Sequence, residues 1–237
     1  MKEYRKEELR NYVIGNVLFI ITLSGIFDSV FDNNINDITD IIHLLFESAL
    51  LSSIIYIYIY IVDSMIPYFI KEKIALFPIN KPGSVVFKSI VKKKKGYNDD
   101  RFTIDEVKDK YKDILKEVEK TEKAINKEYN QKKKNDLKRD IKKYQNSKWF
   151  SIYIKHKDDN AVFTTQKDFL LNRDMNVITL SIAAIYLIIC LFSDTIIFKW
   201  SVIILLIAEY IATSIAAKLK AIRFVLTVVS RDIHVDK

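Results

Sequence analysis

Cysteine, proline and glycine are all scarce in this chain of 237 residues. The only cysteine, Cys190, has no second thiol in the chain with which to form a disulfide, so nothing in the sequence depends on an oxidising compartment. Three prolines and four glycines are too few for a turn-rich β-sandwich or a glycine-rich nucleotide-binding loop. These absences favour an all-helical protein.

Basic residues are absent from a long stretch near the start of the chain. Residues 11–70 contain no lysine or arginine and six acidic residues, whereas residues 71–173 contain 28 basic and 16 acidic residues, a local charge of +12. The first ten residues and the last 64 each contribute +1, which accounts for the net charge of +8. Such long blocks of charge indicate a chain that is partly embedded in a membrane.

Four stretches are long and apolar enough to cross a bilayer, whose hydrocarbon core requires about 20 residues of helix. They are residues 12–31, 41–62, 176–192 and 198–217. The first is too long, and too polar at its far end, to be a cleaved signal peptide, so we expect it to be retained. The sequence therefore predicts an all-α polytopic membrane protein. It has four transmembrane helices and a helical, basic cytosolic insertion between the second and third spans.

The orientation of the spans follows from lysine and arginine, which concentrate on the cytoplasmic side of a membrane. Basic residues precede the first span and follow the second and fourth, while residues 32–40 hold three acids and no base; Lys199 is the exception. We expect both termini in the cytoplasm. Abundant Ile, Lys, Asn and Tyr are typical of AT-rich bacterial genomes, which favours the bacterial inner membrane.

The predicted parts are an N-terminal transmembrane pair (1–65), a cytosolic basic helical domain (66–173), and a C-terminal transmembrane pair with a short cytosolic tail (174–237).

A helical pattern begins at Thr103 in the basic insertion. Thr103, followed by Asp105 and Glu106, is typical of a helix N-cap. Apolar side chains then recur every seven residues, as a short coiled-coil stripe of Ile104, Tyr111, Val118 and Ile125. The pattern stops at residues 130–135 and resumes at Leu137, Ile141 and Tyr144. We expect two helices, or one helix with a break, which pack as an antiparallel hairpin or against another subunit.

Two short segments further along the chain show weak alternation of apolar and polar residues. They are residues 149–154 and 161–164. Alternation with a period of two is typical of strands, so we expect these segments to form a small β-hairpin.

Catalytic and cofactor-binding signatures are absent from the sequence. It contains no G-x-x-x-x-G-K-[ST] loop, no G-x-G-x-x-G motif, no H-E-x-x-H motif and no C-x-x-C pair. The three histidines, His43, His156 and His234, are far apart along the chain. We therefore expect neither an enzyme nor a metal or cofactor site, and we assign no catalytic residue.

Three ionisable side chains fall within the predicted spans. His43 and Glu47 are four residues apart, hence on one helical face, and Glu209 lies in the middle of the fourth span. A charged side chain at the bilayer centre costs roughly 2.5–3.5 kcal/mol, so it usually faces a partner or a water-filled path. Glu209, Glu47 and His43 are therefore candidate pore-lining or intramembrane polar residues. An interhelical hydrogen bond, or a shallow position near the interface, is the alternative for each.

Clusters of basic residues mark the cytosolic insertion as a candidate binding surface for anions. The candidate residues are Lys92, Lys93, Lys94, Lys95, Lys132, Lys133, Lys134, Lys138, Arg139, Lys142 and Lys143. One interpretation is attraction to the anionic membrane surface, and a second is simply solvated helix faces. A third is a site for single-stranded nucleic acid or a nucleotide, because tyrosines and Trp149 lie near these clusters and aromatic rings stack on bases.

Small residues recur every four positions in the last span, at Ala208, Ala212 and Ala216. This spacing lets two helices in a membrane approach closely, within one chain or between subunits. Four spans are too few to enclose a water-filled path comfortably, so we expect a homo-oligomer, with a tetramer favoured.

The order of two spans, a basic cytosolic domain and two further spans resembles the plan of membrane effectors of bacterial anti-phage defence. The plan is most similar to that of the membrane protein of the Hailong system. The resemblance is one of architecture, and it assigns no site residue. It implies an oligomeric ion channel held closed by short single-stranded DNA, which a partner nucleotidyltransferase makes.

Three functions compete on these observations. The first is a gated, ion-conducting effector that depolarises the inner membrane in anti-phage defence. The second is a non-conducting membrane scaffold or sensor that recruits a cytosolic partner. The third is a small transporter, which is disfavoured because the halves of the chain show no inverted repeat.

Overall fold

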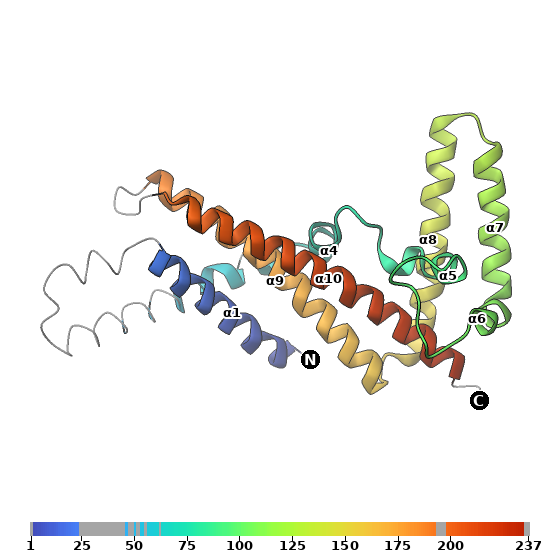
Figure 1. The fold of residues 1–237 in the computed structure, drawn as a ribbon, viewed down its shortest axis with the longest axis horizontal. Helices are drawn as coiled ribbons and strands as arrows, with labels where there is room; N and C mark the ends of the chain where they lie inside the picture. Colours follow the sequence, from blue (N-terminus) through green and yellow to red (C-terminus); the bar gives the residue numbers. More distant parts are fainter. Residues whose placement is uncertain are drawn as a thin grey trace, which may run out of the picture. The chain divides into compact units, whose positions relative to one another are not determined.

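The computed structural model describes residues 2–23, 46, 50, 53–54, 56–61, 63–192 and 198–234. The regular structure of these residues is helical, and they contain no strand (Figure 1). The all-helical fold expected from the scarcity of glycine and proline is therefore confirmed for the described part of the chain.

The β-hairpin predicted from residues 149–154 and 161–164 is wrong. The first segment lies in α8 (Gln131–His156) and the second in α9 (Asn160–Phe192). The buried side chains of α8 are Ile141, Gln145, Trp149 and Ile152. Their spacing of three to four residues is that of a helix face and not that of a strand. The alternation around Trp149 is too short to outweigh this longer pattern.

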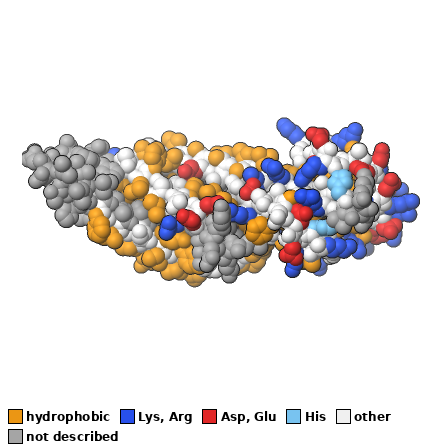
Figure 2. Space-filling model, turned by 90° about the horizontal axis from the view of Figure 1, so that it is seen from below, with side chains coloured by type: hydrophobic (Ala, Val, Ile, Leu, Met, Phe, Trp, Pro, Cys, Tyr) orange, Lys and Arg blue, Asp and Glu red, His pale blue; other side chains and the backbone are white. Residues whose placement is uncertain are grey.

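The chain divides into two compact units. The apolar unit comprises residues 1–75 and 170–217, and the basic unit comprises residues 76–169 and 218–237. The long helices α9 and α10 (Trp200–His234) each contribute residues to both units. In Figure 2, hydrophobic side chains dominate the visible surface of the apolar unit, whereas charged side chains gather over the basic unit.

One face each of α1 (Lys2–Leu23), α9 and α10 forms the core of the apolar unit. The buried residues on these faces are Leu9, Val13, Val17, Ile178, Ile182, Tyr186, Val202 and Leu206. Within each helix they recur every fourth position, which places them on a single side of the helix. On α10, Ile204, Ile207, Ile211 and Ile215 are instead more than half exposed. An exposed apolar face of this kind suits lipid or a second apolar helix.

Within the part of the chain that the structure describes, two helices are long and apolar enough to cross a membrane, namely α9 and α10. Helix α9 contains the predicted third span, and α10 contains the predicted fourth span except residues 198–199. Helix α9 begins already at Asn160, and α10 continues to His234. The predicted first span, 12–31, overlaps α1 up to Leu23, and the rest of it lies outside the described residues. The predicted second span, 41–62, lies largely outside them, although residues 56–61 are helical. The number of four spans stays a prediction.

The end of α10, for which a short cytosolic tail was predicted, is part of the basic unit. Phe224, Val225, Val228 and Val229 are buried in the basic unit, where Lys220 also pairs with Asp168 at 2.6 Å. The compact units therefore differ from the predicted parts 66–173 and 174–237. The reason is that α10 continues as a helix whose apolar side chains complete the core of the basic unit.

Short helices build the rest of the basic unit. After α4 (Tyr68–Leu76) come η1 (Pro82–Ser84), α5 (Val86–Val91), α6 (Ile104–Lys110) and α7 (Lys112–Lys127). The predicted N-cap at Thr103 is confirmed. The Glu106 backbone N–H donates to the Thr103 hydroxyl at 3.3 Å, and the Thr103 backbone N–H donates to the Glu106 carboxylate at 2.7 Å.

Helices α7 and α8 lie side by side as a hairpin (Figure 1). Val118 and Ile125 of α7 are buried against Ile141 of α8, and Leu137 and Tyr144 pack at the edge of this cluster. Of the two arrangements predicted for these stripes, the structure has the hairpin. Three residues separate the two helices, which is a typical connection for antiparallel neighbours.

The heptad stripe is not continuous over its first half. Tyr111 interrupts it, since α6 ends just before this residue and α7 begins just after it. The Tyr111 ring packs on Phe87 with ring centroids 4.9 Å apart, and its hydroxyl donates to Asp232 at 2.8 Å. Tyr111 therefore packs against α5 and α10.

Candidate functional site

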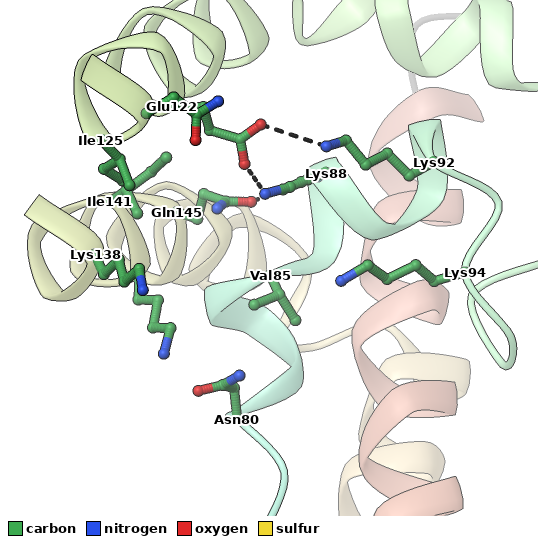
Figure 3. A pocket seen from close by; sticks show the side chains of 12 residues that line it. Asn80, Val85, Lys88, Lys92, Lys94, Glu122, Ile125, Lys138, Ile141 and Gln145 are labelled. Carbon is green, nitrogen blue, oxygen red and sulfur yellow. Dashed lines mark hydrogen bonds and ion pairs between the residues drawn. The ribbon is translucent and has the colours of Figure 1, made fainter. Parts of the chain in front are cut away.

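A basic pocket of about 380 Å³ lies among α5, α7 and α8 in the basic unit (Figure 3). This volume falls within the range of pockets that hold small ligands. Five of the lining side chains are lysines and one is a glutamate. The lining residues are Asn80, Val85, Lys88, Lys92, Lys94, Glu122, Ile125, Asn126, Lys138, Ile141, Lys142 and Gln145.

The glutamate of the pocket, Glu122, is shared by two lysines. The Lys88 ammonium forms an ion pair with one carboxylate oxygen, and the Lys92 Nζ lies 3.4 Å from the other (Figure 3). The side chains of Glu122 and Lys88 are 22% and 30% exposed, so this pair is largely shielded from solvent. Lys94, Lys138 and Lys142 form no ion pair with any residue that the structure describes.

Crowding of positive charge affects the titration of Lys88. Burial lowers the pKa of the Lys88 ammonium, and the nearby charges of Lys92 and Lys94 lower the pKa further. A single carboxylate cannot neutralise five ammonium groups, so the pocket keeps an excess of positive charge. Such a concave, positively charged surface attracts anions.

The remaining walls of the pocket offer amide groups and apolar surface. Gln145 is only 2% exposed, and its Oε1 accepts the backbone N–H of Lys88 at 3.5 Å. Asn80 and Asn126 add two further amides, while Val85 and Ile141 supply apolar side chains. A ligand that carries both an anionic group and a ring or other apolar part matches this lining.

The structure brings together only some of the predicted anion-binding residues. Lys92, Lys94, Lys138 and Lys142 line the pocket. The others lie outside the pocket lining: Lys93, Lys95, Lys132, Lys133, Lys134, Arg139 and Lys143. Positions 138 and 142 are one helical turn apart and share a face of α8, whereas 139 and 143 belong to the adjacent face. On that face, Arg139 pairs with Asp136 of the same helix at 3.1 Å.

The runs of basic residues in the sequence do not point to Lys88, Glu122 and Gln145, which also line the pocket. A signal for Lys88 existed, because it is the only basic residue in the apolar stretch 82–91. No local pattern distinguishes Glu122 from the other acids of α7, since its role depends on the side chains of α5 opposite it.

In the apolar unit, Glu209 of α10 accepts a hydrogen bond from a polar side chain of α1. The Tyr12 hydroxyl of α1 donates to the Glu209 Oε2 at 3.3 Å, and it also lies 2.7 Å from the Thr179 Oγ1 of α9. The buried Asn176 donates to the Tyr210 carbonyl of α10 at 2.9 Å. This geometry provides the interhelical hydrogen bond that was one of the two interpretations of Glu209. The pore-lining role stays a prediction.

The other intramembrane candidates, His43 and Glu47, lie outside the described residues. Elsewhere in the described ranges, no group of three or more His, Cys, Asp and Glu side chains is placed to hold a metal ion.

A nearly buried polar cluster joins three elements of the basic unit. The His156 Nε2 at the end of α8 lies 2.9 Å from the Asp232 Oδ1 of α10, and the Tyr111 hydroxyl donates to the Oδ2. The histidine and aspartate side chains are 10% and 11% exposed. This contact could not be predicted from the sequence, because His156 and Asp232 are 76 residues apart along the chain. Its geometry fixes the end of α10 in the basic unit.

Comparison with known proteins identifies no relative of this chain: no family model, no curated protein and no solved structure matches it.

Proposed function

We propose that this chain is an oligomeric ion channel of the bacterial inner membrane and that an anionic ligand in the basic pocket controls its conduction. The observation that carries the proposal is that α9 and α10 each build both units. Ile182 and Leu206 of these helices are buried in the apolar unit, and Phe169 and Phe224 of the same helices are buried in the basic unit. A ligand that alters packing in the basic unit therefore acts on helices that also form the apolar unit.

The apolar unit is the proposed membrane part. Its helices α9 and α10 have the length and composition to cross a bilayer. In the proposed topology two further spans precede the basic unit, and both termini and the basic unit lie in the cytoplasm. This orientation is supported by the absence of lysine and arginine from residues 11–70.

Conduction is proposed to occur at a junction between subunits, with a tetramer favoured. Ala208 and Ala212 lie on the exposed face of α10 in the single chain, and small residues allow a second helix to pack closely there. Glu209 is adjacent to this face, so a ring of Glu209 carboxylates, one from each subunit, would attract cations.

The resemblance to anti-phage membrane effectors supplies the biological part of the proposal. The ligand would be a single-stranded nucleic acid or a nucleotide, and a partner nucleotidyltransferase would produce it. Release of this ligand from the pocket would open the channel and depolarise the membrane. The excess of lysine in the pocket supports an anionic ligand of this kind.

Induced expression in bacteria, with a voltage-sensitive dye as the readout, tests conduction. The parent chain should collapse the membrane potential when it is produced without its partner. Glu209→Gln keeps the size and hydrogen-bonding capacity of the side chain but removes its charge, so it should preserve oligomer size while reducing depolarisation by about tenfold. Glu119→Gln removes one charge from an exposed position of α7 and should depolarise like the parent.

Two results would contradict the proposal. An intact membrane potential at full expression would favour the alternative of a non-conducting scaffold or sensor. A monomeric mass by light scattering in mild detergent would exclude a path between subunits. If Glu209→Gln instead breaks the oligomer, its hydrogen bond with Tyr12 is the dominant role of this side chain.

A further inference from the structure

The basic pocket already contains one anionic group, and that group belongs to the chain itself. Glu122 reaches from α7 and pairs with Lys88 of α5 and with Lys92 just after it. The other three lysines that line the pocket have no anionic partner in the described part of the chain. The pocket therefore has the charge of an anion site, and within it the Glu122 carboxylate pairs with Lys88 and Lys92 only.

We propose that Glu122 is a built-in competitor for a phosphate ester of nucleotide size, and that the phosphate of this ligand displaces the Glu122 carboxylate from Lys88 and Lys92. This inference rests on the proposed control by an anionic ligand and names both the ligand chemistry and the group that the ligand replaces.

Charge and oxygen count favour the exchange. A carboxylate brings one negative charge and two oxygens, whereas a phosphate monoester brings a charge of about −1.5 to −2 and three oxygens. The additional charge can be met by Lys94 and Lys138, which Figure 3 shows beside the pocket, and by Lys142, which also lines it. More lysines are thus available to a phosphate than Glu122 pairs with, and charge-assisted hydrogen bonds between ammonium and phosphate groups are of the strong kind.

The size and lining of the pocket favour a small organic phosphate over a bare ion. A volume of about 380 Å³ is far larger than one phosphate group requires. The buried amide of Gln145 and the side chains of Val85 and Ile141 leave polar and apolar surface next to the lysines. A ring attached to the phosphate can occupy this surface.

Displacement of Glu122 also has a mechanical result. The ion pair between Lys88 and Glu122 ties α5 to α7. When a phosphate takes the place of the carboxylate, α7 loses this direct tie and is held through the ligand instead. Ligand binding in the pocket thereby changes the attachment of the α7–α8 hairpin to α5, because it removes the ion pair between Glu122 and Lys88.

Ligand binding to the purified full chain in an uncharged detergent tests the proposal. The probe is a rhodamine-labelled dithymidine with a 5′-phosphate, followed by fluorescence anisotropy, with unlabelled adenosine monophosphate and inorganic phosphate as competitors. Glu122→Gln should bind the probe on the order of tenfold more tightly than the parent, because the competing charge is gone. Lys142→Gln should bind it on the order of tenfold more weakly.

Matched controls separate the pocket from net charge. Glu119→Gln and Lys123→Gln make the same charge changes at exposed positions of α7 and should bind like the parent. The proposal is overturned if Glu122→Gln and Glu119→Gln bind equally, or if the probe without its 5′-phosphate binds as tightly as the probe with it. Far-UV circular dichroism of each variant verifies that binding is compared between folded proteins.

Two sources of the phosphate are distinguished by repeating the titration in nanodiscs. Competition by phosphatidic acid, whose phosphate is a monoester, but not by phosphatidylcholine, would support the site and assign the phosphate to a lipid headgroup. Equal binding in both lipids would support a soluble nucleotide. Because binding is measured without conduction, a chain that binds the probe but leaves the membrane potential intact would refute the proposed channel and not the pocket.

Discussion

Replacing Gly83 by alanine should destabilise the basic unit, because a methyl group has no room at this position. Its Cβ would lie 2.8 Å from the Cε3 and 3.0 Å from the Cδ2 of Trp149, and 3.1 Å from the Asn146 Oδ1. Carbon atoms in favourable contact are about 3.5–4.0 Å apart, so the indole would have to move by roughly 1 Å. The Trp149 ring is 8% exposed and is held by Phe224 and Tyr153, with ring centroids 5.4 Å and 5.8 Å away.

The size of the effect follows from these contacts. Adding a methyl group to a well-packed site costs about 1–3 kcal/mol. Movement of the indole would also weaken the hydrogen bond that the Trp149 N–H donates to the Val225 carbonyl at 3.4 Å. Each kcal/mol lowers the unfolding temperature of a unit of this size by roughly 3–5 °C. We therefore expect Gly83→Ala to unfold roughly 5–10 °C below the parent.

Thermal unfolding in detergent, followed by far-UV circular dichroism, measures this change. Gly15→Ala on α1 is the matched control, since its Cβ meets nothing within 4 Å and alanine in a helix is favoured over glycine by roughly 0.5–1 kcal/mol. In a Trp149→Phe background the smaller ring leaves space, so the cost of Gly83→Ala should shrink. An unchanged unfolding temperature for Gly83→Ala would show that the indole yields freely and would refute the packing argument.

Two further predictions concern buried acids of the basic unit. Burial alone would raise the pKa of Asp99, but hydrogen bonds and charge from Arg101 lower the pKa below its usual value, so the paired carboxylate stabilises the fold above pH ~4. The stability difference between the parent and Asp99→Asn should be constant at neutral pH and vanish as the pH falls below that value; a pH-independent difference in unfolding temperature would contradict this. Asp232→Ala leaves the Tyr111 hydroxyl and the His156 ring without their shared acceptor and should lower the free energy of unfolding by about 1–3 kcal/mol in a denaturant titration. A loss within measurement error would show that water replaces the carboxylate.

Those parts of the fold that depend on neighbours in the sequence were predictable. The cap at Thr103 needs only Glu106, three residues on, and both hydrogen bonds of the cap are present. The α7–α8 hairpin is also local, because Val118 and Ile141 lie on stripes separated by a short connection. Tyr111 shows the limit of such patterns. Its spacing matches the stripe, but its partners belong to α5 and the distant end of α10.

For the pocket, runs of lysine were a poor guide to geometry. Successive lysines in a helix point to different faces, so Lys142 lines the pocket whereas its neighbour Lys143 does not. The isolated Lys88 is more central to the site, because its short helix lies opposite Glu122 of α7. That pairing brings together residues 34 positions apart (122 − 88), and no period within either helix encodes it.

The end of α10 imposes a constraint of rotational phase on the core of the basic unit. Ala221, Phe224, Val225 and Val228 are buried in this unit, and their spacing of three and four residues places them on one face of the helix. Inserting a single residue between Ala221 and Phe224 would turn the positions on either side of it by about 100° relative to each other around the helix axis. Ala221 and Phe224 could then no longer face the core together, and Phe224 could not keep its contacts with Trp149, Tyr153 and Phe169 while Ala221 stayed buried. This part of α10 can therefore be lengthened or trimmed only by steps that restore whole turns of the helix.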